Sequence, residues 1–187
     1  INPFDQPDVE AAKVAARGLL DATPAPEAPI AVDGAVEIRA SEAIASQITD
    51  LDSGLKALFR ALGANGYVSI QAYLDRLGLP ELEDVRAPLA AAVQRPVTFG
   101  WGPRFLHSTG QFHKGGPAVG VFLQLSTLDS KDLAIPGREF TFGELIRAQS
   151  DGDASVLAEH GRPVLRLRFT NTEAGLAQLR EALTRLG

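Results

Sequence analysis

The run VGVFLQLS at residues 119–126 decides the fold that this sequence predicts. It is almost continuously apolar, and such a run suits a central strand that is buried on both faces of a sheet. Residues 97–101 are predicted to be a second strand. Residues 164–169 are predicted to be a third, because their apolar and polar side chains alternate. A short strand at residues 36–38 is expected to lead into Ser41, the N-cap of a helix at residues 42–49.

Helical segments separate these strands. Residues 67–74 fit either a strand that enters a helix or a helix throughout, and both interpretations stay open. Alternation of strands and helices predicts an α/β fold, a three-layer sandwich with a largely parallel sheet. The predicted helices lie at residues 51–62, 80–92, 142–149, 153–160 and 173–186.

The beginning of the chain differs from the rest. Residues 1–22 are predicted to form a helix of about four turns, since apolar side chains recur there at helical spacing. Residues 23–35 hold three prolines and a glycine, which indicates a semi-rigid linker. The α/β domain is therefore expected at residues 36–187. Because the chain opens on Ile1 and holds no Met, we expect its terminus to come from cleavage or design within a longer protein.

Composition excludes several classes of protein. The chain has 187 residues, of which 45% are hydrophobic and 22% charged, as in ordinary globular domains. Its net charge of −5 argues against general nucleic-acid binding. No apolar stretch reaches the ~18 residues of a membrane span, and no signal peptide opens the chain. Cys is absent, so disulfides and thiolate metal sites are excluded.

The candidate site is a glycine-rich stretch, GWGPRFLHSTGQFHKGGP at residues 100–117. It lies between two predicted strands, inside a longer region, residues 85–128, that has no Asp or Glu. Strand ends of α/β sheets commonly bind ligands, and glycine N–H groups with nearby cations suit a phosphate or carboxylate. The alternative is an ordinary turn in a buried region. The candidate ligand-binding residues are Arg104, His107, Ser108, Thr109, Gln111, His113 and Lys114.

Other chemistry is disfavoured in this stretch. A metal site at His107 and His113 lacks a nearby carboxylate or thiolate. Ser108 is a poor candidate nucleophile, because residues adjacent in sequence rarely face one another and no Asp lies near to orient His107. A Walker phosphate loop is excluded, since Gly115 rather than Ser or Thr follows Lys114.

Two stretches carry a resemblance to a known family. INPFDQPDVEAAK at residues 1–13 resembles the C-terminal signature of bacterial phosphoglucose isomerases, with Asp8 where that family usually has Gly. The stretch at residues 100–117, VFLQLS at 121–126 and IPGREFTFGELIRAQSDGD at 135–153 are similar to the C-terminal extension of isomerases fused behind a transaldolase. The resemblance covers essentially the whole chain.

This resemblance implies an activity and a set of site residues. The family interconverts glucose 6-phosphate and fructose 6-phosphate through a cis-enediol, without a metal or an organic cofactor. The residue matching Lys13 assists ring opening and steadies charge on O1, and the residue matching Gln6 contacts the substrate. The catalytic Glu, an assisting Arg and the phosphate loop belong to segments upstream of Ile1. The resemblance therefore implies a cytoplasmic protein whose isolated 187-residue segment is inactive.

Three interpretations follow from the resemblance. In the first, the chain supplies residues to an isomerase. In the second, it binds a phosphosugar or docks an upstream sugar-isomerase or transaldolase domain and has no chemical role. In the third, it only completes an interface. In each of them residues 1–22 are the terminal helix of a sugar-isomerase domain. We expect that helix to be detached from the α/β domain or swapped onto a neighbouring chain, and oligomerisation is possible.

Overall fold

A six-stranded sheet organises the molecule. The structure is a computed structural model that describes residues 6–22, 27–128 and 132–186. The strand order is β1-β2-β6-β5-β3-β4; β3, β4, β5 and β6 are parallel, whereas β2 runs antiparallel to β6 and β1 antiparallel to β2. The strands are β1 Ala31–Asp33, β2 Val36–Ala40, β3 Tyr67–Tyr73, β4 Val97–Trp101, β5 Gly120–Thr127 and β6 Val164–Phe169.

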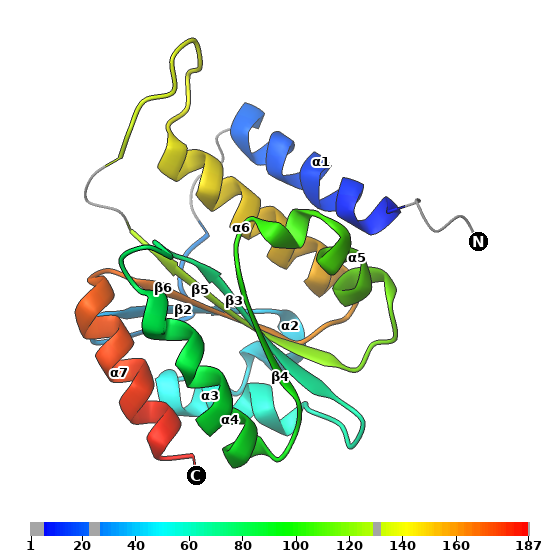
Figure 1. Ribbon diagram of the computed structural model, residues 1–187, viewed down its shortest axis with the longest axis vertical. Coiled ribbons are helices and arrows are strands. Elements are labelled where there is room, and N and C mark those ends of the chain that lie inside the picture. Colours follow the sequence, from blue (N-terminus) through cyan, green and yellow to red (C-terminus); the bar gives the residue numbers. More distant parts are fainter. Residues whose placement is uncertain (1–5, 23–26, 129–131, 187) are drawn as a thin grey trace.

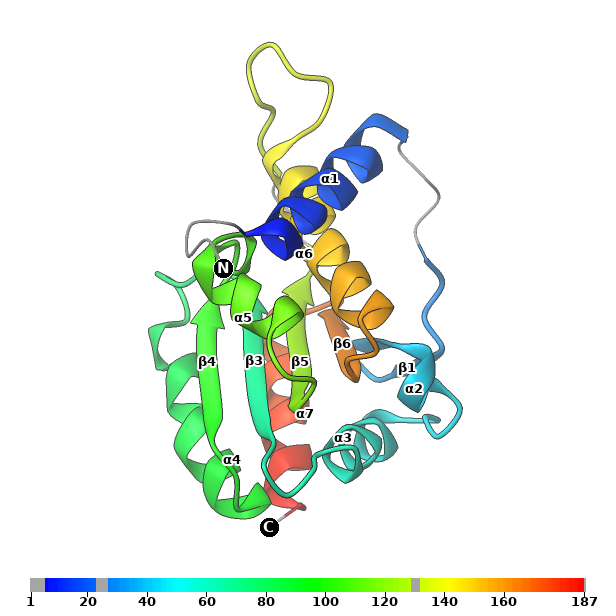
Figure 2. The ribbon, with the colours of Figure 1, turned by 90° about the vertical axis from the view of Figure 1, so that its right-hand side faces the viewer.

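Helices cover both faces of this sheet, as Figures 1 and 2 show. On one face, α3, α4 and α7 pack with the strands into the main apolar core. On the other face lie α5 and α6, over a smaller apolar cluster around Phe122 and Leu157. The three-layer α/β sandwich predicted from the sequence is confirmed. The helices are α1 Pro7–Ala22, α2 Glu42–Ala45, α3 Leu51–Arg60, η1 Pro80–Val85, α4 Arg86–Val93, η2 Arg104–Leu106, α5 Ser108–Gly115, α6 Phe142–Glu159 and α7 Thr172–Thr184.

Strand β5 occupies the centre that its sequence predicts. It pairs in parallel with β3 on one side and β6 on the other, and residues 120–125 are all buried. Val121, Leu123 and Leu125 face the main core, so the continuous apolar run reflects burial on both faces. The ambiguous residues 67–74 are resolved as a strand, β3.

Helix α1 is not detached, which corrects the expectation for residues 1–22. Its residues Val9, Ala12 and Ala16 are buried, and it lies across α6 on the outside of the sandwich (Figure 2). A Cβ atom on Gly152 of α6 would lie 2.8 Å from the backbone nitrogen of Ala16. The missing side chain at Gly152 lets the two helix backbones approach closely, so the apolar stripe of α1 is covered by its own domain.

Three further boundaries differ from the prediction. A linker was predicted at residues 23–35, but its last part, Ala31–Asp33, forms strand β1, which pairs with β2. Residues 142–149 and 153–160 were expected to be two helices, but α6 runs unbroken through Gly152. The predicted loop at 100–117 holds the end of β4, the short helix η2 and the helix α5.

Candidate functional site

The two candidate residues at the start of the chain lie on or beside α1. Gln6 directly precedes the helix, and its carbonyl oxygen accepts a hydrogen bond from the Glu10 N–H at 3.1 Å. Lys13 is half exposed, with Nζ 3.4 Å from a carboxylate oxygen of Glu10, and Arg17 contacts the same carboxylate at 2.8 Å. Hydrogen bonding from Arg17, and then Lys13, lowers the pKa of Glu10. Lys13 therefore sits on the solvent side of α1.

Four of the predicted loop residues face solvent at the beginning of α5. Arg104 lies on η2, and His107 is the N-cap residue of α5, which Ser108 and Thr109 begin. All four are exposed, and the His107 side chain makes no capping hydrogen bond. They remain able to contact a molecule at this surface.

Gln111 has a structural role that the sequence did not reveal. Its Oε1 accepts hydrogen bonds from the backbone N–H groups of Asp8 at 3.1 Å and Val9 at 3.4 Å, and its Nε2 donates to the Asp8 carboxylate. These bonds satisfy the first N–H groups of α1, which have no partner within the helix. Gln111 thereby joins α5 to α1, and its amide group is already occupied.

The prediction that Lys114 binds an anion at the surface is wrong for this structure. Its side chain is fully buried, and Nζ donates to the Asp153 carboxylate and to the Phe105 carbonyl at 3.0 Å. Burial raises the pKa of Asp153, although Lys114 opposes that shift. The ammonium group serves to join α5 to α6 beneath the surface.

His113 is also buried, which corrects its assignment as a ligand-binding residue. Its ring lies among the rings of Tyr67, Phe105, Phe112 and Phe122, at centroid distances of 5.3 to 6.4 Å. Burial, assisted by the neighbouring Lys114 charge, lowers the pKa of His113 to about 4. The imidazole is therefore neutral at pH 7. No group of three or more potential metal-ligating side chains lies together in the described parts of the chain.

A polar layer lies around the Lys114–Asp153 pair, between the sheet and helices α5 and α6. Ser69, Gln71 and Tyr73 point into it from β3. The Ser69 and Tyr73 hydroxyl groups have no hydrogen-bond partner within the described residues, whereas the Gln71 amide faces the Asp153 carboxylate and favours its charged form. Burial, with Asp153 as a further cause, raises the pKa of Tyr73 well above its ordinary value. This layer is enclosed, so it is not a surface site.

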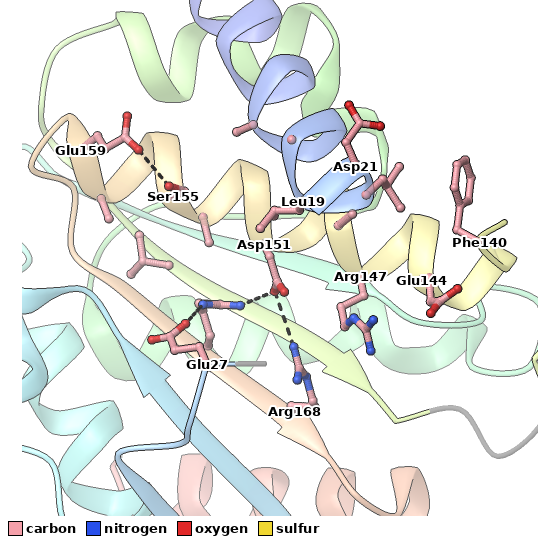
Figure 3. Close-up of a pocket in the computed structure, with 18 of the residues that line it drawn as sticks. Leu19, Asp21, Glu27, Phe140, Glu144, Arg147, Asp151, Ser155, Glu159 and Arg168 are labelled. Carbon is pink, nitrogen blue, oxygen red and sulfur yellow. Dashed lines mark hydrogen bonds and ion pairs between the residues drawn. The ribbon is translucent and has the colours of Figure 1, made fainter. Parts of the chain in front are cut away.

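A large groove lies on the other side of α6. This groove has a volume of about 1140 Å³ and is bordered by the second half of α1, α6, residues 137–140 and strands β2 and β6. Figure 3 shows Arg147 and Asp151 of α6 and Arg168 of β6 at the groove. Residues 164–169 alternate, so the side chains of Leu165 and Leu167 enter the main core whereas Arg166 and Arg168 line the groove.

The charges at the base of this groove are linked through Asp151. One of its carboxylate oxygens contacts Arg166 and lies 3.5 Å from Arg168. Arg166 also pairs with Glu27 at 2.7 Å. Burial lowers the pKa of Arg168, while Asp151 acts in the opposite direction. These arginines were not singled out from the sequence; the signal that could have found them is the alternation of Arg with apolar residues in 164–169, which places both arginines on one face of the strand.

Comparison with known proteins supports the fold alone. No protein-family model matches the sequence, and no curated protein matches it. A solved structure of a hypothetical protein from Thermus thermophilus is similar over 95% of this chain, with a TM-score of 0.64 and 16% sequence identity. The match covers 43% of that protein, so this chain spans less than half of its length. Within the described residues, no helix is both long and apolar enough to cross a membrane.

Proposed function

We propose that this chain is the C-terminal part of a cytoplasmic glucose-6-phosphate isomerase, in which Lys13 and Gln6 contact the sugar phosphate. The observation that carries the proposal is the motif of residues 1–13, whose described part forms the start of α1. Residues 1–5 of that motif lie outside the described residues. The family resemblance supplies the activity, and the structure supplies a rigid support for the two side chains.

The packing of α1 supports this role for Lys13. Ala12 and Ala16 pack against α6, Val9 is also buried, and Gln111 fixes the first turn of the helix. Lys13 lies at the edge of this packed face, where its side chain is half exposed and Glu10 is its only ion-pair partner among the described residues. An ammonium group held on a rigid helix can stabilise negative charge that develops on a substrate oxygen.

The proposed reaction needs groups from two parts of the protein. A carboxylate on an upstream domain moves the proton between C2 and C1 of the sugar, and Lys13 steadies the charge on O1 of the enediol. Arg104 on η2 and His107 at the N-cap of α5, both exposed, are the further candidates to contact the sugar phosphate. The isolated 187-residue chain is expected to be inactive.

Kinetics of the full-length parent protein test the role of Lys13. Lys13→Ala should lower kcat for fructose 6-phosphate isomerisation by about a hundredfold or more, the scale of losing one group that stabilises the transition state. Arg17→Ala is the matched control, because Arg17 pairs with the same carboxylate on the same helix. Unchanged turnover in Lys13→Ala would overturn the assignment.

Docking onto an upstream domain is a second candidate function. Exposed apolar side chains gather at the projecting segment of residues 132–141 and the start of α6, where Leu133 is 70% and Phe142 47% exposed. Such side chains are common where a protein contacts a partner. In the full-length parent, Leu133→Ser should speed proteolytic cleavage between the domains if this surface docks, and leave it unchanged if it does not.

A further inference from the structure

We propose that the groove beside α6 is a binding site for a small, hydroxyl-rich oxyanion, whose phosphate or carboxylate group binds Arg147 and Arg168. The site lies apart from Lys13 and Gln6, and the proposal does not depend on the isomerase function. Its basis is a pair of arginines that converge on one groove with their hydrogen-bonding capacity largely unused.

Arg168 provides the first observation. Its side chain is only 10% exposed, yet within the described residues its sole ion pair is the 3.5 Å contact with Asp151, and it makes no hydrogen bond. A guanidinium has five N–H donors, and a nearly buried charge is normally paired and hydrogen-bonded. The Asp151 oxygen nearest to Arg168 is the same Oδ1 that already accepts a hydrogen bond from Arg166.

Arg147 provides the second observation. It lies one helical turn before Asp151 on α6 and lines the same groove (Figure 3). No described residue forms an ion pair with it. Glu144, one turn earlier on the helix, is engaged in the capping box of Thr141. The Asp132 carboxylate, which is close enough to interact with the Arg147 charge, accepts hydrogen bonds from Thr141 and Gly143. Arg147 and Arg168 therefore come from two different elements and leave guanidinium donors facing one space.

The chemistry of these two groups defines the charged part of the ligand. A guanidinium binds the two oxygens of a carboxylate or phosphate with parallel hydrogen bonds. Two such groups from separate elements suit one oxyanion between them.

The rest of the groove restricts the ligand further. Carboxylates also line it, among them Asp21, Glu27, Glu42 and Glu159. They repel an extended polyanion such as a nucleic acid, whereas carboxylate oxygens accept hydrogen bonds from hydroxyl groups. The volume suits a small metabolite. A sugar phosphate or a sugar acid has this combination of one oxyanion and several hydroxyl groups.

Calorimetric titration of the 187-residue chain tests the proposal with four probes: inorganic phosphate, glucose 6-phosphate, gluconate and glucose. We expect glucose 6-phosphate, gluconate or both to bind with a Kd below about 10 mM, and glucose to bind far more weakly. The two anionic probes distinguish phosphate from carboxylate, and inorganic phosphate shows what the hydroxyl groups add. Glucose binding as tightly as the anions, or no binding by any probe, would overturn the proposal.

Variants locate the binding in the groove. Arg168→Gln and Arg147→Gln should each raise the Kd of the tighter anionic probe by about tenfold or more, since hydrogen bonds to charged groups are lost. Arg180→Gln, an exposed change on α7 in the opposite layer, should leave the Kd unchanged. If Arg168→Gln unfolds the chain, the Kd measured for Arg147→Gln, an exposed change on α6, shows whether the anion binds in the groove.

Two further results separate this site from the proposed isomerase site. An unaltered Kd in Arg147→Gln overturns the groove assignment, whatever the isomerase assay gives. Lys13→Ala should leave binding by the 187-residue chain unchanged, because Lys13 does not line the groove. Loss of binding in Lys13→Ala would contradict the separation of the two sites.

Discussion

At the scale of single residues, two buried groups on α5 explain why the glycine-rich stretch is not a surface loop. Lys114 and Asp153 are both fully buried, and the pair is the only one with both side chains at 0% exposure among the described ion pairs. His113 lies next to Lys114 within an aromatic cluster. The Lys114 ammonium and the neutral His113 ring therefore both contribute to packing between α5 and the rest of the domain.

Removing one member of the buried pair should be costly. Asp153→Asn leaves the Lys114 charge without its partner, and we expect a loss of about 3–5 kcal/mol in the free energy of unfolding. Urea denaturation of the wild type and the variant measures this difference in the free energy of unfolding. Asp52→Asn is the control, since it breaks the exposed Asp52–Arg185 pair and should cost less than about 1 kcal/mol. Equal, small losses in both variants would show that the buried pair does not hold α5.

His113 should make stability depend on pH. Its pKa is about 4 in the folded chain against an ordinary value of 6.5, so the unfolded chain takes up the proton first as the pH falls. The contribution of neutral His113 is fully present above about pH 6.5 and is lost between pH 6.5 and pH 4. From pH 7 to pH 5 this loss amounts to about 2 kcal/mol.

His113→Phe isolates that contribution, because phenylalanine suits the aromatic cluster and carries no titratable group. Urea denaturation at pH 7 and pH 5 should show a smaller loss of stability in His113→Phe than in the wild type. Identical pH dependence in the two proteins would mean that His113 is protonated as readily in the fold as in the unfolded chain.

At the scale of elements, the close crossing of α1 and α6 is the feature that the sequence conceals best. The strands at 97–101 and 164–169 were predicted within the observed bounds, and the central strand was predicted within one residue, because each pattern is local. The covering of the α1 stripe depends on Gly152, which is remote in sequence. An apolar stripe in sequence indicates that a helix is covered, but not by which element.

Contacts between residues distant in sequence also explain why the candidate site was predicted only in part. The acid-free region 85–128 suggested cations free to bind an anion, yet Asp153, 39 residues after Lys114, supplies the missing carboxylate. The exposed positions Arg104, His107, Ser108 and Thr109 were foreseen as candidates. The groove was not, because β2, β6, α1 and α6 meet there from distant parts of the chain.

The crossing can be tested with a pair of glycine substitutions. In Gly152→Ala, the new Cβ would lie 2.8 Å from the Ala16 nitrogen and 3.1 Å from the Ala12 carbonyl oxygen, so α1 must shift. We expect faster amide hydrogen exchange in α1. Gly18→Ala is the control, because nothing lies within 4 Å of its Cβ; it should stabilise α1 by up to about 1 kcal/mol. Unchanged exchange in Gly152→Ala would contradict the close packing.

At the scale of the whole molecule, the sandwich presents two surfaces with separate chemistry. One combines the solvent side of α1 with the exposed beginning of α5, which Gln111 holds together. The other is the arginine-lined groove on the far side of α6. The proposed isomerase function uses the first surface together with an upstream domain, and the proposed oxyanion site uses the second.

The central claim is that the parent protein is an aldose–ketose isomerase that works through an enediol. The most direct measurement is NMR of the products when the full-length protein acts on fructose 6-phosphate in deuterated water. We predict glucose 6-phosphate that carries deuterium at C2, because the proton on the carboxylate base exchanges with solvent. Absence of glucose 6-phosphate from the products would contradict the claim.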